Sequence, residues 1–357
     1  MSLPHLPNVT KLSRYVTRIL GQNPGRYSLQ GTNTYLIHDP DHPTSLILLD
    51  TAQGIPSYLP LVTPFLSSPS PLSIQIVLSH WHQDHVGGLK DVLEVLKGQK
   101  WTIWKHATSG GEEEKDQDRE LEEVVRRIVE GGDKGDESAH SAAETLVKGG
   151  RIRALKQGQK LKIGNVELDV LHTPGHTTDS ISLLLSAPES DTKLFTFDTV
   201  LGHGTAVFGD LGAYMASLNY LLEKMGKEGE GETEVYPGHG ETIKEGRAKV
   251  GEYLRHRQER EDQVVEALKV GRGGGGKVLK ASDLTEHIYA STIPDELKPA
   301  ATRGLLLHLN KLEKDGQVQR KEAPGSDKDE APLPGWNDGW KWVGSGSERA
   351  SPNGAKI

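Results

Sequence analysis

The chain of 357 residues is longer than a typical single domain, which predicts one large domain and an accessory one. Its formal net charge of −8 and its sequence pI near 6.0 argue against a protein built throughout to coat nucleic acid or an anionic membrane. Cysteine is absent, so disulfides and thiolate ligands are excluded, and any metal has to be held by imidazole and carboxylate groups.

Signals for export and for membrane insertion are missing from the sequence. Residues 1–20 contain no continuous apolar segment of the kind that opens a secreted protein, and no run of about 18 apolar residues occurs. We therefore expect a soluble, cytoplasmic protein with no membrane partner.

Apolar runs dominate the first hundred residues. The runs at 15–20, 32–37 and 45–50 predict adjacent, mostly buried strands, and IQIVLSH at 74–80 predicts a further one. Residues 87–98 then carry apolar side chains at helical spacing. A histidine-rich segment therefore lies between the carboxyl end of a strand and a helix.

Residues 109–149 change character, with far more acidic than basic side chains and hardly any aromatic ones. We interpret them as an acidic surface insertion with one polar helix at about 116–130 between flexible glycines. The composition favours a role in solvation over a role in chemistry.

Strand patterns return at 154–176, 180–185, 193–199 and 234–240, with a helix predicted at 213–225. Three of these strands have His176, Asp198 and His239 at their ends. In sheets covered by helices, functional sites assemble at that edge. The pattern therefore predicts that these three side chains meet.

The composition becomes helical from about residue 246. Helices predicted at 247–270, 281–293 and 294–316, followed by a strand at 317–321, suggest a small winged-helix-like accessory domain at 246–343, after a catalytic domain at 1–245. We expect a disordered loop at 322–335 and a disordered tail at 344–357. Trp336, Trp340 and Trp342 lie where the chain would return as the second strand of the wing.

The segment SHWHQDH concentrates possible metal ligands. If it is extended, His80, His82 and Asp84 share one face, and a following turn brings His85 round. Gly87 and Gly88 then allow close packing of the backbone where the helix begins.

Four donors on one loop exceed what a single catalytic Zn²⁺ requires, since such sites leave a position open for water. A lone loop histidine is usually just an exposed side chain, but this spacing favours ligands. Seven donors are enough for two ions that share a carboxylate: His80, His82, Asp84, His85, His176, Asp198 and His239.

SHWHQDH resembles the HxHxDH motif of the metallo-β-lactamase superfamily, and LHTPGHT, FDTVLG and YPGHG resemble its later metal-binding motifs in the same order. The match covers about residues 15–242. With the LQGTNTYLI segment and the helical C-terminal part, the chain is similar to the group that contains β-lactamase-like endoribonucleases and fungal thioesterases that release polyketides from acyl carrier protein. The resemblance implies an α/β fold, an αββα sandwich.

The resemblance also implies a ligand set. His80, His82 and His176 would hold a first zinc ion, and Asp84, His85 and His239 a second, with Asp198 bridging the two. One departure is Phe197, where a glycine often precedes the bridging aspartate. The substitution removes no ligand.

A hydroxide that bridges two Zn²⁺ ions would be the nucleophile, because the metal lowers the pKa of bound water from about 15.7 toward about 7. No serine or cysteine nucleophile is then needed. We assign Asp84 as a ligand that also orients this water. His203, in LGHGTAVF, is a candidate catalytic residue that faces the substrate, with a purely hydrogen-bonding role as the alternative.

Four further residues near the motifs receive weaker interpretations. Asn33 and Thr34 either line the site or build a turn, and the turn is favoured, whereas His172 is expected to be structural. Trp81 is either a pocket wall or a core or lid residue.

The seven donors predict a metal-dependent hydrolase more firmly than they predict its substrate. The overall acidity disfavours RNA, so our first prediction is a thioesterase of polyketide biosynthesis, in secondary metabolism, with an acyl carrier protein or polyketide synthase as partner. The first alternative is a single-strand endoribonuclease, because residues 246–321 contain 15 Lys and Arg against 11 Asp and Glu, a net +4. A non-catalytic metal-binding protein is the second alternative.

The accessory domain is a candidate for docking a carrier protein or for forming a homodimer. The helix around Leu305 to Leu312 is the first place to look, although a leucine-rich helix usually packs into its own core. The acyl chain, the metal used in the cell, the oligomeric state and the role of the acidic insertion are not determined by the sequence.

Overall fold

The computed structural model describes residues 3–67, 73–131, 145–146, 150–188, 192–226, 232–270, 278–289, 292–321 and 336–344. The chain divides into two compact units, a large unit (residues 1–208 and 216–251) and a small unit (residues 209–215 and 252–357). Helices α5 (Leu211–Lys224) and α6 (Gly246–Val270) run from one unit into the other. No helix in the described ranges is long and apolar enough to cross a bilayer.

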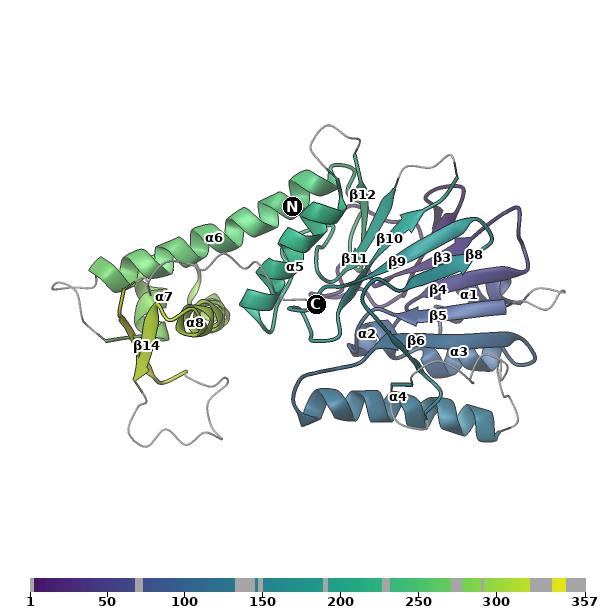
Figure 1. Cartoon of the computed structure of the whole chain (residues 1–357), viewed down its shortest axis with the longest axis horizontal. Coiled ribbons are helices and arrows are strands. Elements are labelled where there is room, and N and C mark those ends of the chain that lie inside the picture. The colour runs from purple at the N-terminus through teal and green to yellow at the C-terminus, as the bar shows by residue number, and fades with distance from the viewer. Residues whose placement is uncertain are drawn as a thin grey trace. The chain divides into compact units, whose positions relative to one another are not determined.

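Two β-sheets form the centre of the large unit (Figure 1). The first has seven strands in chain order, antiparallel from β1 to β4 and parallel from β4 to β7. Its strands are β1 (Val9–Lys11), β2 (Val16–Leu20), β3 (Asn33–His38), β4 (Ser45–Leu49), β5 (Ser73–Leu78), β6 (Lys100–His106) and β7 (Arg153–Leu155).

The second sheet has five strands in the order β12-β11-β10-β9-β8, antiparallel except for the parallel pair β11 and β12. They are β8 (Lys160–Ile163), β9 (Val166–His172), β10 (Ile181–Ser186), β11 (Lys193–Phe197) and β12 (Glu234–Pro237). Side chains from both sheets, such as Tyr35, Ile47 and Phe195, share one buried core.

The strands predicted from the apolar runs are present, and the first three are neighbours as expected. β4 is apolar from Leu46 to Leu49 because these four residues are buried between layers. The sequence patterns do not predict β1, β6, β7 or helix α1 (Leu59–Leu66). Buried and more exposed side chains alternate along β6, but one of the buried positions is Lys105. A lysine in the sequence does not indicate a core position.

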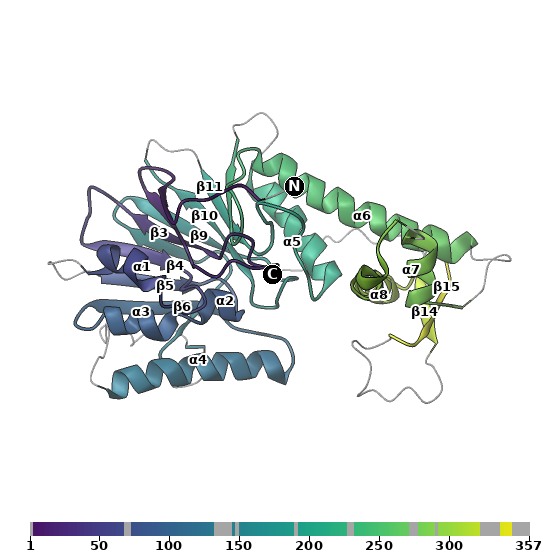
Figure 2. The ribbon, with the colours of Figure 1, turned by 180° about the vertical axis from the view of Figure 1, so that it is seen from behind.

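Helices α1, α3 (Leu89–Val95) and α4 (Glu112–Glu130) pack on the outer face of the first sheet, as the view from behind shows (Figure 2). The end of α5 and the start of α6 pack at β12, where Gly246 lies against Thr233 and Met225. The layers therefore form the αββα sandwich that the resemblance implies.

Helix α4 corrects the prediction of a purely polar helix at about 116–130. It begins at Glu112, and its Leu121, Val125 and Ile128 are buried in the core under the first sheet. The helix is amphipathic: its apolar residues face the core and most of its acidic residues face outward, whereas Asp118 and Glu122 are buried. Residues 132–144 and 147–149 of the predicted insertion lie outside the described residues.

The small unit contains part of α6, α7 (Ala281–Tyr289), a short 3₁₀ helix η3 (Asp295–Leu297) and α8 (Lys298–Lys314), with a sheet in the order β13-β15-β14. Its strands are β13 (Leu279–Lys280), β14 (Val318–Lys321) and β15 (Gly339–Trp342). β15 pairs with β14 in antiparallel fashion, which confirms the predicted second strand of the wing. This helix order and sheet form the predicted winged-helix domain.

The leucine-rich helix α8 packs into the core of the small unit. Leu305, Leu309 and Leu312 are fully buried there beside Trp340. This agrees with the expectation that a leucine-rich helix packs into its own core, so these leucines are not a docking surface. The predicted loop at 322–335 and residues 345–357 of the predicted tail lie outside the described residues.

Candidate metal centre

The histidine-rich segment starts at the end of β5 and turns at once into a short helix. His82 is the N-cap of α2 (Gln83–Val86), and the Gly87 amide donates to the Gln83 carbonyl at 2.8 Å. The predicted extended segment with one shared face is therefore wrong, since Asp84 and His85 lie on a helical turn. A Cβ atom at Gly88 would overlap the carbonyl oxygen of Thr51, which confirms the predicted close packing.

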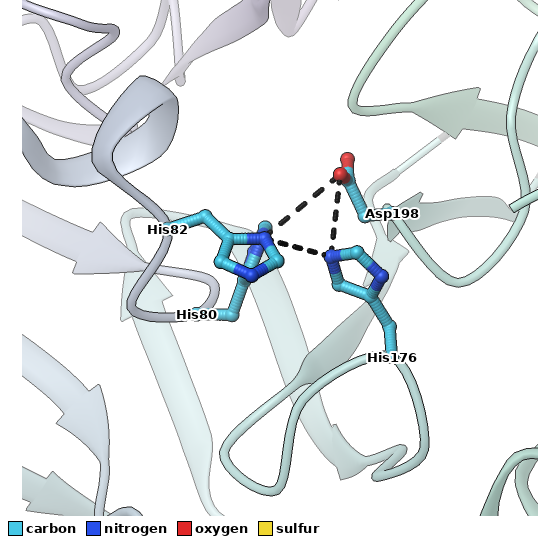
Figure 3. A group of neighbouring side chains, drawn as sticks. All are labelled: His80, His82, His176 and Asp198. Carbon is cyan, nitrogen blue, oxygen red and sulfur yellow. Dashed lines mark hydrogen bonds and ion pairs between the residues drawn. The ribbon is translucent and has the colours of Figure 1, made fainter. Parts of the chain in front are cut away.

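Four of the predicted ligands converge in a first donor set, made of His80, His82, His176 and Asp198 (Figure 3). The Nδ1 atom of His82 lies 3.0 Å from Nε2 of His80 and 2.9 Å from Nε2 of His176. The Oδ2 atom of Asp198 lies 3.5 Å from Nε2 of His176 and 3.9 Å from Nε2 of His80.

The other three ligands form a second donor set, made of Asp84, His85 and His239. The Oδ2 atom of Asp84 lies 3.5 Å from Nε2 of His85 and 3.3 Å from Nε2 of His239. Both imidazole nitrogens are also 3.3 Å from Oδ1 of Asp198. Asp198 thus turns one oxygen to each donor set.

The spacing of these atoms fits a cation in each set. Ligand atoms about 2.0 to 2.2 Å from a tetrahedral ion lie roughly 3.3 to 3.6 Å apart, near the separations found here. Two of the buried atoms, Nε2 of His85 and Oδ1 of Asp198, make no hydrogen bond. Because buried polar atoms are normally satisfied, such atoms indicate ligands of an ion.

The two donor sets differ in their affinity for protons. Burial and the nearby His176 lower the pKa of His82 to about 4, and burial and His85 lower the pKa of His80 well below its usual value. Burial alone would also lower the pKa of His239, but the carboxylates of Asp198 and Asp84 raise it to about 9. His80 and His82 of the first set are therefore neutral at neutral pH, whereas His239 of the second set holds a proton.

Asp50 supports both donor sets, and the sequence analysis missed it. Its buried carboxylate lies 2.7 Å from Nδ1 of His85 and accepts hydrogen bonds from the amide and the hydroxyl of Ser79 at 2.7 and 2.8 Å. The Ser79 hydroxyl lies 3.0 Å from Nδ1 of His80. A carboxylate directly after a buried parallel strand is the signal that would have found it.

Asn33 and Thr34 lie on β3, so the expectation that they build a turn is wrong. The Asn33 amide donates to the carbonyls of Pro237 and Gly240, both at 2.9 Å, and so holds the loop that contains His239. The neighbouring Thr32 hydroxyl donates to Oδ2 of Asp84 at 3.0 Å. This segment therefore positions the second donor set.

The loop after β11 lies against both donor sets. The Val207 carbonyl accepts a hydrogen bond from Nδ1 of His176 at 2.7 Å, which leaves Nε2 free of its proton for an ion. The Gly202 amide donates to the His239 carbonyl at 2.9 Å. His203, next in the chain, is exposed.

Trp81 and His172 have different surroundings. The half-buried ring of Trp81 lies edge-on to His82, with 4.5 Å between centroids, which puts it beside the first donor set. His172 stacks on His106 at 3.9 Å and lies 2.9 Å from the Thr178 carbonyl through Nε2. These contacts agree with the structural role predicted for it.

Phe197 precedes Asp198 with a φ of 45°, in the left-handed region where glycine is favoured. Its buried ring stacks on Phe195, with 6.4 Å between centroids. The Phe197 carbonyl accepts a hydrogen bond from the Gly238 amide at 2.8 Å. The ring is thus accommodated by the core, and a strain of about 1 to 3 kcal/mol is stored next to the shared carboxylate.

Comparison with known protein families gives two matches. Residues 28–239 match the metallo-beta-lactamase superfamily, and residues 281–328 match the beta-lactamase associated winged helix domain. The first match contains all seven donors.

Relatives extend over most of the chain. A protein named beta-lactamase-like protein 2 homolog from Caenorhabditis elegans is 33% identical over 320 residues, which cover 89% of this chain and 90% of that one. A protein named atrochrysone carboxyl ACP thioesterase from Passalora fulva is 30% identical over 317 residues, 88% of this chain and 80% of that one. The crystal structure of a beta-lactamase domain protein from Burkholderia ambifaria has the same fold, with a TM-score of 0.65, 18% identity, and coverage of 94% of this chain and 93% of that chain.

The pKa differences predict that acid releases the cation of the second donor set first. A proton competes with a cation for the same nitrogen wherever the pH lies below the pKa of that nitrogen. For His239, with its pKa near 9, competition grows as the pH falls from about 9, whereas for His82 it begins only near pH 4. Cation-stripped protein titrated with Zn²⁺ at pH 8, 7 and 6 should lose affinity at one site much more steeply than at the other. Equal pH dependence at both sites would contradict this assignment.

Proposed function

The chain belongs to the metallo-β-lactamase superfamily of hydrolases, and we propose that it is a dinuclear zinc thioesterase that releases an acyl or polyketide chain from an acyl carrier protein. The observation that carries the proposal is the position of Asp198 between two complete donor sets, one oxygen toward each. Two cations that share a carboxylate can act together on one carbonyl group.

Hydrolysis of a thioester needs an activated water, stabilisation of the oxyanion and departure of a thiolate. When bound, the pair of cations supplies the first two by lowering the pKa of water and polarising the carbonyl. Water adds to the carbonyl carbon, the C–S bond breaks, and the sulfur leaves as a thiolate that takes up a proton. No protein nucleophile takes part.

Asp84 has the properties needed to orient the water. Burial would raise its pKa, but His85 and His239 hold that pKa below its usual range, so the group stays a carboxylate and accepts hydrogen bonds. Its Oδ2 is fixed by the Thr32 hydroxyl, and 28% of its side chain is exposed. The carboxylate therefore reaches both the second donor set and solvent.

His203 is the candidate that protonates the departing sulfur. Its loop is attached to the His239 segment through the Gly202 amide, and its side chain is exposed. A positioned imidazole can act as a general acid toward a leaving group. A thiol is itself fairly acidic, with a pKa of about 8.5 in cysteine, so the expected contribution is modest.

The choice of a thioester over RNA has two supports. One is the similarity over most of both chains to a protein named for action on an acyl carrier protein. The other is that the aromatic faces of Tyr289 and Trp342 in the small unit are covered by Arg260 and Lys269, 4.4 and 4.6 Å from the ring centroids. Rings covered in this way are poor platforms for stacking unpaired bases.

Replacing His82 by alanine should abolish hydrolysis. The first donor set would keep two imidazoles and the shared carboxylate, so the purified variant should retain about one zinc ion where the unchanged protein retains about two. Metal content by mass spectrometry and turnover of a thioester check this, with His5→Ala at an exposed histidine as the control. Hydrolysis at the unchanged rate in His82→Ala would refute the mechanism.

Replacing His203 by alanine should lower kcat for a thioester by about 100-fold, at the low end of the range for a positioned general acid, and leave the zinc content unchanged. The effect should shrink with substrates whose thiol is more acidic, because these need less help to leave. An unchanged kcat across such a series would remove His203 from the mechanism.

The substrate class is decided by offering both kinds of substrate. Acyl carrier protein loaded with a polyketide should be hydrolysed, whereas single-stranded RNA should remain intact under the same conditions. His82→Ala, tested on both substrates, excludes a contaminating nuclease or esterase. Cleavage of RNA alone would replace the thioesterase by the endoribonuclease.

A further inference from the structure

Lys105 is a fully buried lysine at the carboxyl end of β6. Its Nζ lies 2.6 Å from Oδ2 of Asp179 and 2.7 Å from Oδ1 of Asp118, and it donates to the His106 carbonyl at 3.0 Å. A charge is kept inside a protein only when it is paired and hydrogen-bonded. Lys105 meets that condition through Asp118 and Asp179. We call these three residues the lysine triad.

Asp179 belongs to the loop that carries His176. Its Oδ1 accepts a hydrogen bond from the hydroxyl of Thr177, the residue next to His176, at 2.7 Å. The Thr177 amide and hydroxyl also contact the hydroxyl of Ser180, at 3.2 and 2.6 Å. Asp179 is therefore the point through which the buried lysine holds this loop.

Asp118 approaches the same lysine from α4. Its Oδ2 accepts hydrogen bonds from the amide and the hydroxyl of Thr108, at 3.0 and 2.8 Å. Glu114, one turn earlier in α4, accepts a hydrogen bond from the hydroxyl of Thr178. The helix predicted only to solvate the surface thus contacts the His176 loop directly and through Lys105.

We propose that Lys105 is a positioning residue: by pairing with Asp179 it fixes the His176 loop and so sets how tightly the first donor set holds its cation. The inference rests on the proposed function only in taking His176 as a ligand. Asp118, from α4, supplies a second carboxylate that compensates the buried charge of the lysine.

The position of the triad favours this role over general stabilisation. His176 is the only member of the first donor set on this loop, whereas His80 and His82 follow β5 and Asp198 follows β11. If the loop becomes more mobile, His176 is displaced and the other three residues of the first donor set stay in place. Such a change weakens the binding of one cation and leaves the site of the other cation folded.

Asp179→Asn and Asp118→Asn form a matched pair of variants. Each variant removes the negative charge of one of the two carboxylates that pair with Lys105. The asparagine keeps one side-chain oxygen, which can still accept the hydrogen bond from the threonine hydroxyl, Thr177 in one case and Thr108 in the other. Only Asp179 lies on the His176 loop. A purely structural triad predicts similar effects from both variants, whereas a positioning triad predicts an effect mainly from Asp179→Asn.

Zinc affinities measured by competition with a chromophoric chelator test the proposal. Asp179→Asn should bind one cation about 10 to 100 times more weakly, the range found when a group that orients a ligand is lost, and should hold the second as the unchanged protein does. Asp118→Asn should keep both affinities within about threefold. In cobalt-loaded protein, the visible spectrum should change in Asp179→Asn and not in Asp118→Asn.

Three results would overturn the proposal: equal weakening in both variants, loss of both cations together in Asp179→Asn, or unchanged affinities in Asp179→Asn. Circular dichroism spectra of the two variants and of the unchanged protein check that all three are folded when their affinities are compared. The readout needs no substrate, so it is separate from the proposed function. Unchanged protein that binds two cations and hydrolyses neither thioester nor RNA would refute the thioesterase and leave this inference standing.

Discussion

The sharing of one buried carboxylate between two groups of imidazoles is the constraint on which the large unit depends. Asp198 faces His80 and His176 with one oxygen and His85 and His239 with the other. The imidazole nitrogens of His80 and His176 lie 3.0 and 2.9 Å from Nδ1 of His82, close enough to surround a common ion. The fold tolerates this cluster because the strands that deliver it are held by two large cores.

Several of the candidate ligands are supported by a residue that lies at or near a strand end. Asp50 follows β4 and reaches His85 directly and His80 through Ser79. Lys105 ends β6 and reaches the His176 loop, and Asn33 begins β3 and reaches the His239 loop. Because the parallel strands of the first sheet end at the same edge, the supporting groups and the ligands meet there.

The candidate metal donors do not identify the substrate. The seven candidate donors define the candidate metal centre, but the same kind of site serves many reactions within one fold. The small unit has a core of its own, with Trp340 and the leucines of α8 buried in it. Specificity is therefore to be sought in exposed groups such as His203.

The sequence by itself determined most strands of the two inner layers, the winged helix and the seven candidate donors, because alternation, helical spacing and short motifs are local properties of the chain. Only the tertiary structure decided that Asp84 and His85 sit on a helical turn, that α4 packs on the sheet, and that Asp50, Asn33 and Lys105 support the centre. A buried lysine in an apolar strand looks like an ordinary polar residue until its two carboxylates, from distant segments, are seen around it. Contacts of this kind leave no local pattern, since they are set by how the layers pack and not by the spacing of neighbouring residues.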